Sequence, residues 1–174
     1  VALGVGALTS NTTGNVNLAV GNSALGANTT GYYNVAIGDA TLGSNTTGTM
    51  NTAVGWRSLY SNTVGEQNTA FGLRALYSNT TGGNNNAFGK DSLFSNTTGQ
   101  FNLAVGDNAL LYNETGSFNT ALGRNAGYNA TGTGNVFIGY TAGSEQTSGD
   151  YKLYISSAEI TYDSNGDLSE IESK

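Results

Sequence analysis

Few side chains in this sequence could carry out chemistry, and their placement argues against catalysis. The 174 residues contain no His and no Cys, which removes the usual general base and the thiolate nucleophile. The carboxylates fall at different places in the repeat described below, so no two are placed as an acid–base pair. Ser and Thr are plentiful, but no base accompanies them. We therefore predict a protein that is not an enzyme, with no catalytic, cofactor-binding or metal-binding residues.

The side chains that could recognise a partner lie in the middle of the chain. Trp56, the only Trp, directly precedes Arg57, and aromatic and basic residues recur nearby. Aromatic rings beside Arg suit the recognition of a glycan or a protein. The candidate adhesive surface comprises Trp56, Arg57, Tyr60, Arg74 and Tyr77. Two alternatives stay open: the tyrosines could pack between chains, and Trp56 with Arg57 could be surface without a function.

The elements that position these residues repeat along the chain. A 17-residue motif starts at Asn11, recurs six more times in exact register, and begins an eighth time at Asn129, one residue early. With the first Asn counted as position 0, each copy has Gly at position 3, Asn at 6, an apolar residue at 9 and Gly at 10. Ala holds position 8 in seven copies, and Leu holds position 14 in six. The opening VALGVGALTS is the back end of a further copy, so we expect a piece of a longer protein.

The repeat predicts stacked strands. Its glycines would interrupt a helix twice in every copy, whereas two short strands fit, one through the NxAxG segment and one through the segment around Leu. The NTTG segment is typical of a turn. One copy buries too little apolar surface to fold alone, but stacked copies share a continuous core. We predict an all-β, parallel β-solenoid of about eight 17-residue rungs over residues 1–148.

The Asn at position 6 is predicted to be structural. Identical Asn residues on successive rungs can bond side chain to side chain along a stack, and a buried ladder is satisfied only if every rung contributes. The predicted ladder comprises Asn17, Asn34, Asn51, Asn68, Asn85, Asn102, Asn119 and Asn135.

The small cross-section of each rung implies that the chain associates with copies of itself. Small residues occupy positions 8 and 13 and larger ones positions 9 and 14, and side chains alternate between the two faces of a strand. One set therefore fills the roll, and the other makes an outward face that is apolar on every rung; the sequence leaves open which is which. A long apolar stripe implies a partner surface, and a homotrimer is the expected assembly.

Charge and hydropathy exclude two classes of partner. The net charge is −6, and residues 145–174 carry most of the excess of acids. This distribution is unsuited to a phosphate backbone or an anionic membrane surface. No apolar run approaches the roughly 20 residues that span a bilayer. We expect no nucleic-acid binding and no direct membrane insertion.

Two repeat segments resemble the head repeat of trimeric autotransporter adhesins, the YadA-like head: NLAVGNSALG (17–26) and NVAIGDATLG (34–43). The longer NTTG-containing pattern is similar to repeat regions of bacterial and phage fibre proteins that carry an endosialidase-type chaperone domain. The segment YKLYIS (151–156) resembles the one that often closes such regions. This resemblance implies a left-handed β-roll, three chains side by side, and the head or stalk of a fibre on the bacterial surface or a phage tail.

The C-terminal segment leaves the pattern. Residues 149–174 are expected to hold a closing strand, a hairpin that turns at Asn165–Gly166, and the start of a neck or stalk. Leu168 and Ile171 are spaced like the start of a coiled coil. The acidic residues near this turn match a calcium loop only in part, because Leu168 stands where Gly is required.

The leading functional hypothesis is a non-catalytic segment of a trimeric extracellular fibre. It would mediate or present adhesion to cells, with a host or prey cell-surface protein or glycan as partner. The alternative is an ice-binding solenoid that uses the columns of Asn at position 0 and Thr at position 2, which recur on almost every rung.

Overall fold

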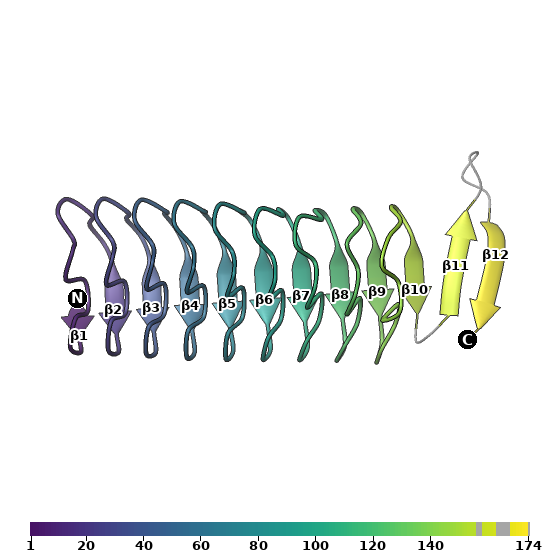
Figure 1. The fold of residues 1–174 in the computed structure, drawn as a ribbon, viewed down its shortest axis with the longest axis horizontal. Helices are drawn as coiled ribbons and strands as arrows, with labels where there is room; N and C mark the ends of the chain where they lie inside the picture. Colours follow the sequence, from purple (N-terminus) through teal and green to yellow (C-terminus); the bar gives the residue numbers. More distant parts are fainter. Residues whose placement is uncertain (156–157, 163–167, 174) are drawn as a thin grey trace.

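The chain forms a β-solenoid of about nine turns, built from ten parallel strands (Figure 1). The computed structural model describes residues 1–155, 158–162 and 168–173, and it contains no helix in these ranges. The parallel strands are β1 (Ala2–Leu3), β2 (Leu18–Val20), β3 (Val35–Ile37), β4 (Thr52–Val54), β5 (Thr69–Phe71), β6 (Asn86–Phe88), β7 (Leu103–Val105), β8 (Thr120–Leu122), β9 (Val136–Ile138) and β10 (Leu153–Ile155). The eight repeats supply β2 to β9, so β1 and β10 extend the rod beyond the eight rungs expected.

The strands follow one another through a single sheet in chain order. Ala36 lies opposite Ala53, and this register holds from rung to rung. The short seventh copy does not disturb the register, because Ala121 still lies opposite Phe137. The residue that this copy lacks falls in the turn between β8 and β9.

Two antiparallel strands follow the parallel ones, as the expected hairpin requires. Strand β11 (Ala158–Tyr162) pairs with β10, and β12 (Leu168–Ser173) pairs with β11, with an irregularity between Thr161 and Tyr162. The turn predicted at Asn165–Gly166 lies outside the described residues. The segment whose spacing resembled the start of a coiled coil is strand β12.

Each rung contains one strand, and the prediction of a second strand around the Leu is wrong. Positions 12 and 14 have left-handed backbone, with φ of 53° at Arg57 and 51° at Leu59. An extended strand does not pass through that region. The segment still bonds from rung to rung, because the Leu59 N–H donates to the Ala75 carbonyl at 2.9 Å. The backbone therefore turns here while remaining stacked.

This turn decides which side chains form the core. The residues at positions 8, 13 and 14 are all buried, such as Ala53, Ser58 and Leu59 on one rung. Position 9 points outward instead, and Ile37 and Phe71 are exposed. The predicted pairing of positions 9 and 14 on one side is wrong, because faces alternate only along extended backbone. The outward apolar column predicted on every rung is present at position 9.

Glycine at position 10 lets adjacent rungs approach closely. Gly38 has φ of +134°, and a Cβ placed there would lie 2.6 Å from the carbonyl oxygen of Gly55. Only glycine adopts this backbone conformation without strain, and only glycine leaves room for the next rung.

The last rungs fill the core with a different pair of residues. Phe137 replaces Ala at position 8, and Gly127 and Gly143 replace Leu at position 14 on either side of it. A Cβ at Gly127 would lie 2.8 Å from the Phe137 ring, and one at Gly143 would lie 2.6 Å from it. One large residue therefore occupies the space that Leu side chains fill elsewhere.

The predicted Asn ladder at position 6 is buried, but most of its bonds join side chain to backbone. The Asn34 Oδ1 accepts a hydrogen bond from the backbone N–H of Asn51 at 3.0 Å, and Asn34 Nδ2 donates to the Gly48 carbonyl at 2.9 Å. Bonds between side chains of this ladder are added only in the middle rungs, as from Asn68 Nδ2 to Asn51 Oδ1 at 3.2 Å. These amides therefore satisfy backbone groups of the neighbouring rung.

A second Asn ladder, at position 0, is the one that joins side chain to side chain. Asn62 Nδ2 donates to Asn45 Oδ1 at 2.8 Å, and Asn79 Nδ2 donates to Asn62 Oδ1 at the same distance. Asn62 Nδ2 also donates to the Gly65 carbonyl of its own turn at 3.0 Å. The Asn therefore closes the NTTG turn, as predicted, and also links the rungs.

Candidate binding surface

Trp56, Arg57 and Tyr60 form a single cluster. The Arg57 guanidinium lies 4.6 Å from the centroid of the Trp56 ring and 5.4 Å from that of Tyr60. Contacts of this kind attract a cation to the electron-rich face of a ring. Trp56 keeps 43% of its surface exposed, whereas Arg57 and Tyr60 are half-buried. The left-handed backbone at Arg57, absent from an ordinary strand, turns the chain at this point.

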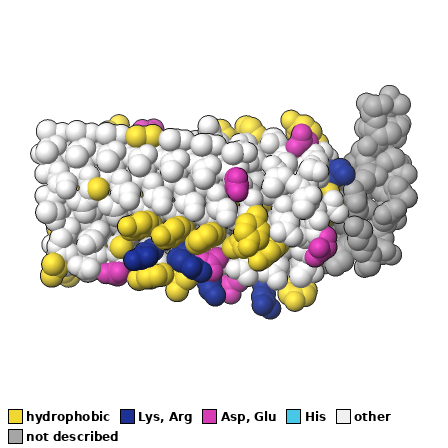
Figure 2. All heavy atoms as spheres, viewed as in Figure 1, with side chains coloured by type: hydrophobic (Ala, Val, Ile, Leu, Met, Phe, Trp, Pro, Cys, Tyr) yellow, Lys and Arg dark blue, Asp and Glu magenta, His cyan; other side chains and the backbone are white. Residues whose placement is uncertain are grey.

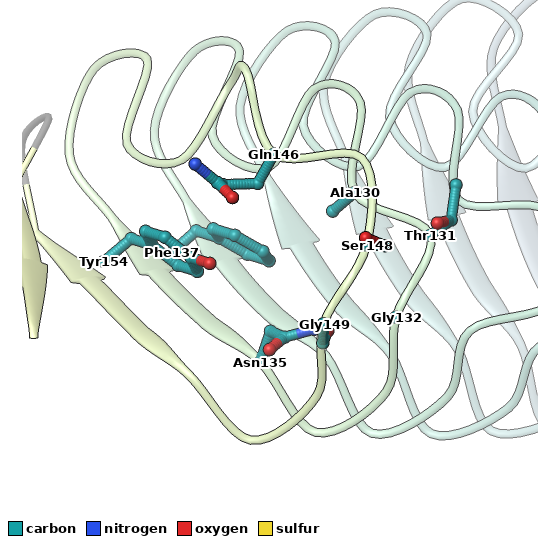
Figure 3. A pocket seen from close by; sticks show the side chains of 9 residues that line it. All are labelled: Ala130, Thr131, Gly132, Asn135, Phe137, Gln146, Ser148, Gly149 and Tyr154. Carbon is teal, nitrogen blue, oxygen red and sulfur yellow. Dashed lines mark hydrogen bonds between the residues drawn. The ribbon is translucent and has the colours of Figure 1, made fainter. Parts of the chain in front are cut away.

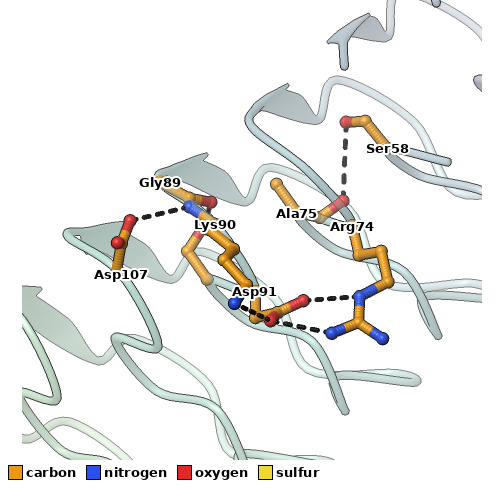
Figure 4. A network of polar contacts seen from close by, with 8 residues as sticks. Ser58, Arg74, Ala75, Gly89, Lys90, Asp91 and Asp107 are labelled. Carbon is orange, nitrogen blue, oxygen red and sulfur yellow. Dashed lines mark hydrogen bonds and ion pairs between the residues drawn. The ribbon is translucent and has the colours of Figure 1, made fainter. Parts of the chain in front are cut away.

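Arg74, one rung further on, forms an ion pair instead. Its Nε and Nη2 donate to the two carboxylate oxygens of Asp91 at 2.8 and 2.9 Å (Figure 4). The hydrogen bond to Asp91 raises the pKa of Arg74 above its ordinary value, against the opposing effect of burial. Lys90 Nζ lies 3.9 Å from Asp91, and the backbone N–H of Lys90 donates to Asp107 (Figure 4). The charge of Arg74 is thus largely neutralised.

A stack of aromatic rings joins the two arginines. Tyr60 and Tyr77 stack with centroids 5.4 Å apart, and Tyr77 and Phe94 with centroids 5.2 Å apart. Arg74 lies 5.0 Å from the centroid of Phe94. The structure therefore brings all five candidate residues together and adds Phe94, which occupies the same repeat position as the tyrosines. Figure 2 shows hydrophobic side chains in a band over the middle rungs, with basic and acidic side chains beside it.

A second surface covers the outer face of the sheet. Positions 7 and 9 point outward, because they alternate along the strand with the core residue at position 8. Position 5 has left-handed backbone, and its side chain is exposed on most rungs. We call this surface the sheet face. Position 9 is apolar on every parallel rung from β2 to β10: Val20, Ile37, Val54, Phe71, Phe88, Val105, Leu122, Ile138 and Ile155. Exposed rings at position 5 extend it, and Phe101 and Phe118 stack there with centroids 5.1 Å apart.

The hollows in the described part of the chain lie away from the cluster around Arg57. One of about 490 Å³ lies open at the first rung, lined by residues that include Val1, Leu8 and Val16. A depression beside Phe137 and Tyr154 has no room for even a water-sized sphere (Figure 3). No group of three or more potential metal ligands gathers in the described part of the chain. Asp163, Asn165 and Asp167, which match a calcium loop in part, are outside it. None of the described residues forms a helix long and apolar enough to cross a membrane.

The columns considered for ice binding are only partly at the surface. The Asn residues at position 0 are buried from Asn28 to Asn113, so they cannot contact ice, and this part of the alternative is wrong. The first Thr of each NTTG turn is bonded as well, as Thr46 Oγ1 donates to the Thr63 carbonyl at 3.1 Å. Only the second Thr, such as Thr47, stands exposed in a single column.

The geometry thus presents two surfaces, the sheet face and the cluster around Arg57. No protein-family model, no curated protein and no solved structure matches this chain.

Proposed function

We propose that this chain is a non-catalytic segment of a homotrimeric extracellular fibre, on a bacterial surface or a phage tail, that mediates or presents adhesion. The observation that carries the proposal is the sheet face, which is apolar at position 9 on nine successive parallel rungs. Monomeric soluble proteins rarely leave a contiguous apolar surface of this length in water.

The repeat itself favours a copy of the same chain as the occupant of the sheet face. Its outward side chains recur at the spacing of adjacent strands, about 4.8 Å. A partner that covers every rung must present matching side chains at the same spacing, and another copy does so without further requirements. The resemblance to YadA-like heads favours three copies over two.

The arrangement of the two surfaces also suits a fibre that binds. Arg57 and the aromatic stack occupy positions 12 and 15, away from the outward positions 5, 7 and 9 of the sheet face. Association through the sheet face would therefore leave the cluster around Arg57 free on every copy. Weak contacts repeated on three chains would add up by avidity.

Light scattering of the purified chain tests the assembly. We expect a mass of about three times 17.8 kDa at micromolar concentration. A monomer of 17.8 kDa at that concentration would contradict the proposed trimer.

Attachment to cells or immobilised glycans tests the adhesive role. Replacing Trp56 and Arg57 by Ala should lower attachment while the mass and the melting temperature stay unchanged, because neither side chain is buried in the core. If the double variant attaches as well as the parent, this segment is a spacer and adhesion belongs to another part of the fibre.

A further inference from the structure

The guanidinium of Arg57 is not neutralised, unlike that of Arg74. Arg74 has an Asp at the same position one rung further on, whereas Arg57 has Arg74 there. No described residue forms an ion pair with Arg57, and its Nε is buried without a hydrogen-bond partner. Its two terminal nitrogens make no hydrogen bond to the described residues and are not buried. They remain available to an anionic ligand.

The surroundings of Arg57 hold this side chain in place. Trp56 and Tyr60 both contact the guanidinium, at 4.6 and 5.4 Å from their ring centroids. A side chain already confined in this way loses less conformational entropy on binding. The planar guanidinium donates two parallel hydrogen bonds to a carboxylate.

The side chains along this part of the rod fit a sugar. Next in sequence to the stacked rings of Tyr60, Tyr77 and Phe94 is a column of serines at Ser61, Ser78 and Ser95. The hydroxyls of these serines form no hydrogen bond with the described residues. The exposed Trp56 ring, the half-buried stacked rings, the serine hydroxyls and the unpaired guanidinium match the apolar ring faces, hydroxyls and carboxylate of an acidic sugar.

We propose that Arg57, Trp56 and Tyr60 bind a carboxylate-bearing sugar unit of an acidic polysaccharide. The inference rests on the proposed adhesive function and names the ligand class of its surface. An acidic peptide would also pair with Arg57, so the experiment below includes polyglutamate as a competing ligand. The serines recur on successive rungs, so a polymer lying along the rod meets the same groups again beyond the first sugar.

Fluorescence of Trp56, the only Trp in the chain, gives a direct readout. The probe is a short oligogalacturonate, and the matched probe is the same oligomer with its carboxylates reduced to neutral alcohols. We expect the acidic oligomer alone to shift the Trp56 emission saturably. Arg57→Gln should weaken binding roughly 10- to 100-fold, as expected for the loss of hydrogen bonds to a charged group. Arg57→Lys keeps the positive charge but loses the planar pair of N–H donors. Its affinity for the acidic oligomer should therefore lie between that of Arg57→Gln and that of the parent.

Arg124→Gln is the matched control, because it removes the same charge from an exposed position outside the cluster. It should bind as the parent does. The proposal would be overturned if the acidic oligomer did not bind, or if the neutral oligomer bound equally well. It would also be overturned if polyglutamate bound as tightly or more tightly, or if Arg124→Gln lost as much affinity as Arg57→Gln. Light scattering on the same samples distinguishes failure of this proposal from failure of the proposed fibre. A trimer that does not bind the oligomer refutes only the proposed ligand. A monomer refutes the proposed assembly.

Discussion

At the scale of single residues, the rod is held together by Asn side chains that form hydrogen bonds with neighbouring rungs. Asn62 gives and receives hydrogen bonds along the column at 2.8 Å, and it also binds the Gly65 carbonyl of its own turn. Such a buried residue cannot be removed without leaving partners on both neighbours unsatisfied.

Replacing Asn62 by Ala should therefore lower the free energy of unfolding by about 1–3 kcal/mol. Thr47→Ala is the control, because this Thr belongs to a neighbouring NTTG turn but is exposed, and it should change stability by less than about 0.5 kcal/mol. Urea unfolding followed by circular dichroism measures both variants. Equal, negligible losses would mean that the column of position 0 contacts water.

At the scale of the element, each rung must fill the same cross-section, and two combinations of residues do so. Most rungs use Ala at position 8 with Leu at position 14, and the rung of Phe137 uses a ring flanked by Gly127 and Gly143. Gly127 has φ of +59°, close to the 52° of Leu110 at the same position. A Leu at residue 127 would therefore fit the backbone. Its Cβ would lie 2.8 Å from the Phe137 ring and 2.9 Å from Leu110 Cδ2, which is the end of a flexible side chain.

This complementarity predicts a rescue. Phe137→Ala should destabilise the chain by about 3–5 kcal/mol through the cavity that it leaves. Gly127→Leu should cost about 1–3 kcal/mol by overpacking against Phe137. The double variant restores the Ala–Leu combination. Its loss of unfolding free energy should therefore be smaller, by at least about 0.5 kcal/mol, than the sum of the losses in the two single variants. Thermal unfolding of the parent and the three variants completes this cycle, and simple additivity would show that the two sites do not share one space.

At the scale of the whole molecule, the sheet face and the cluster around Arg57 are separate surfaces, for which we propose separate roles. Phe71 and Leu73 allow the two to be distinguished, because both are 40% exposed but only Phe71 belongs to the sheet face. In an assembly through the sheet face, a charge at residue 71 would be buried on each copy.

Phe71→Lys should therefore dissociate the assembly, while Leu73→Lys should leave it intact. Sedimentation equilibrium over a range of concentrations measures both masses, and circular dichroism confirms that each variant remains folded. Dissociation by Leu73→Lys but not by Phe71→Lys would move the interface to the other side of the rod.

The sequence by itself determined the features that follow from its period. A 17-residue repeat with fixed Gly and Asn positions allows parallel stacking, and from this came the solenoid, the buried Asn column at position 6 and the outward apolar column. The candidate surface was also proposed from the repeat, because Trp56 stands in a column of mostly small or polar residues and Arg57 follows it directly.

Only the tertiary structure decided what depends on backbone dihedrals and on pairing between rungs. The left-handed φ at Leu59 puts Leu in the core beside Ala, although alternation along a strand had separated them. The Asn side chains at position 0 form a ladder because the stacked turns bring them within hydrogen-bond distance, which the sequence alone does not show. Arg57 and Arg74 likewise differ because a different residue stacks one rung further on. Asp91 follows Arg74 and forms an ion pair with it, whereas Arg74 follows Arg57, which has no ion-pair partner among the described residues.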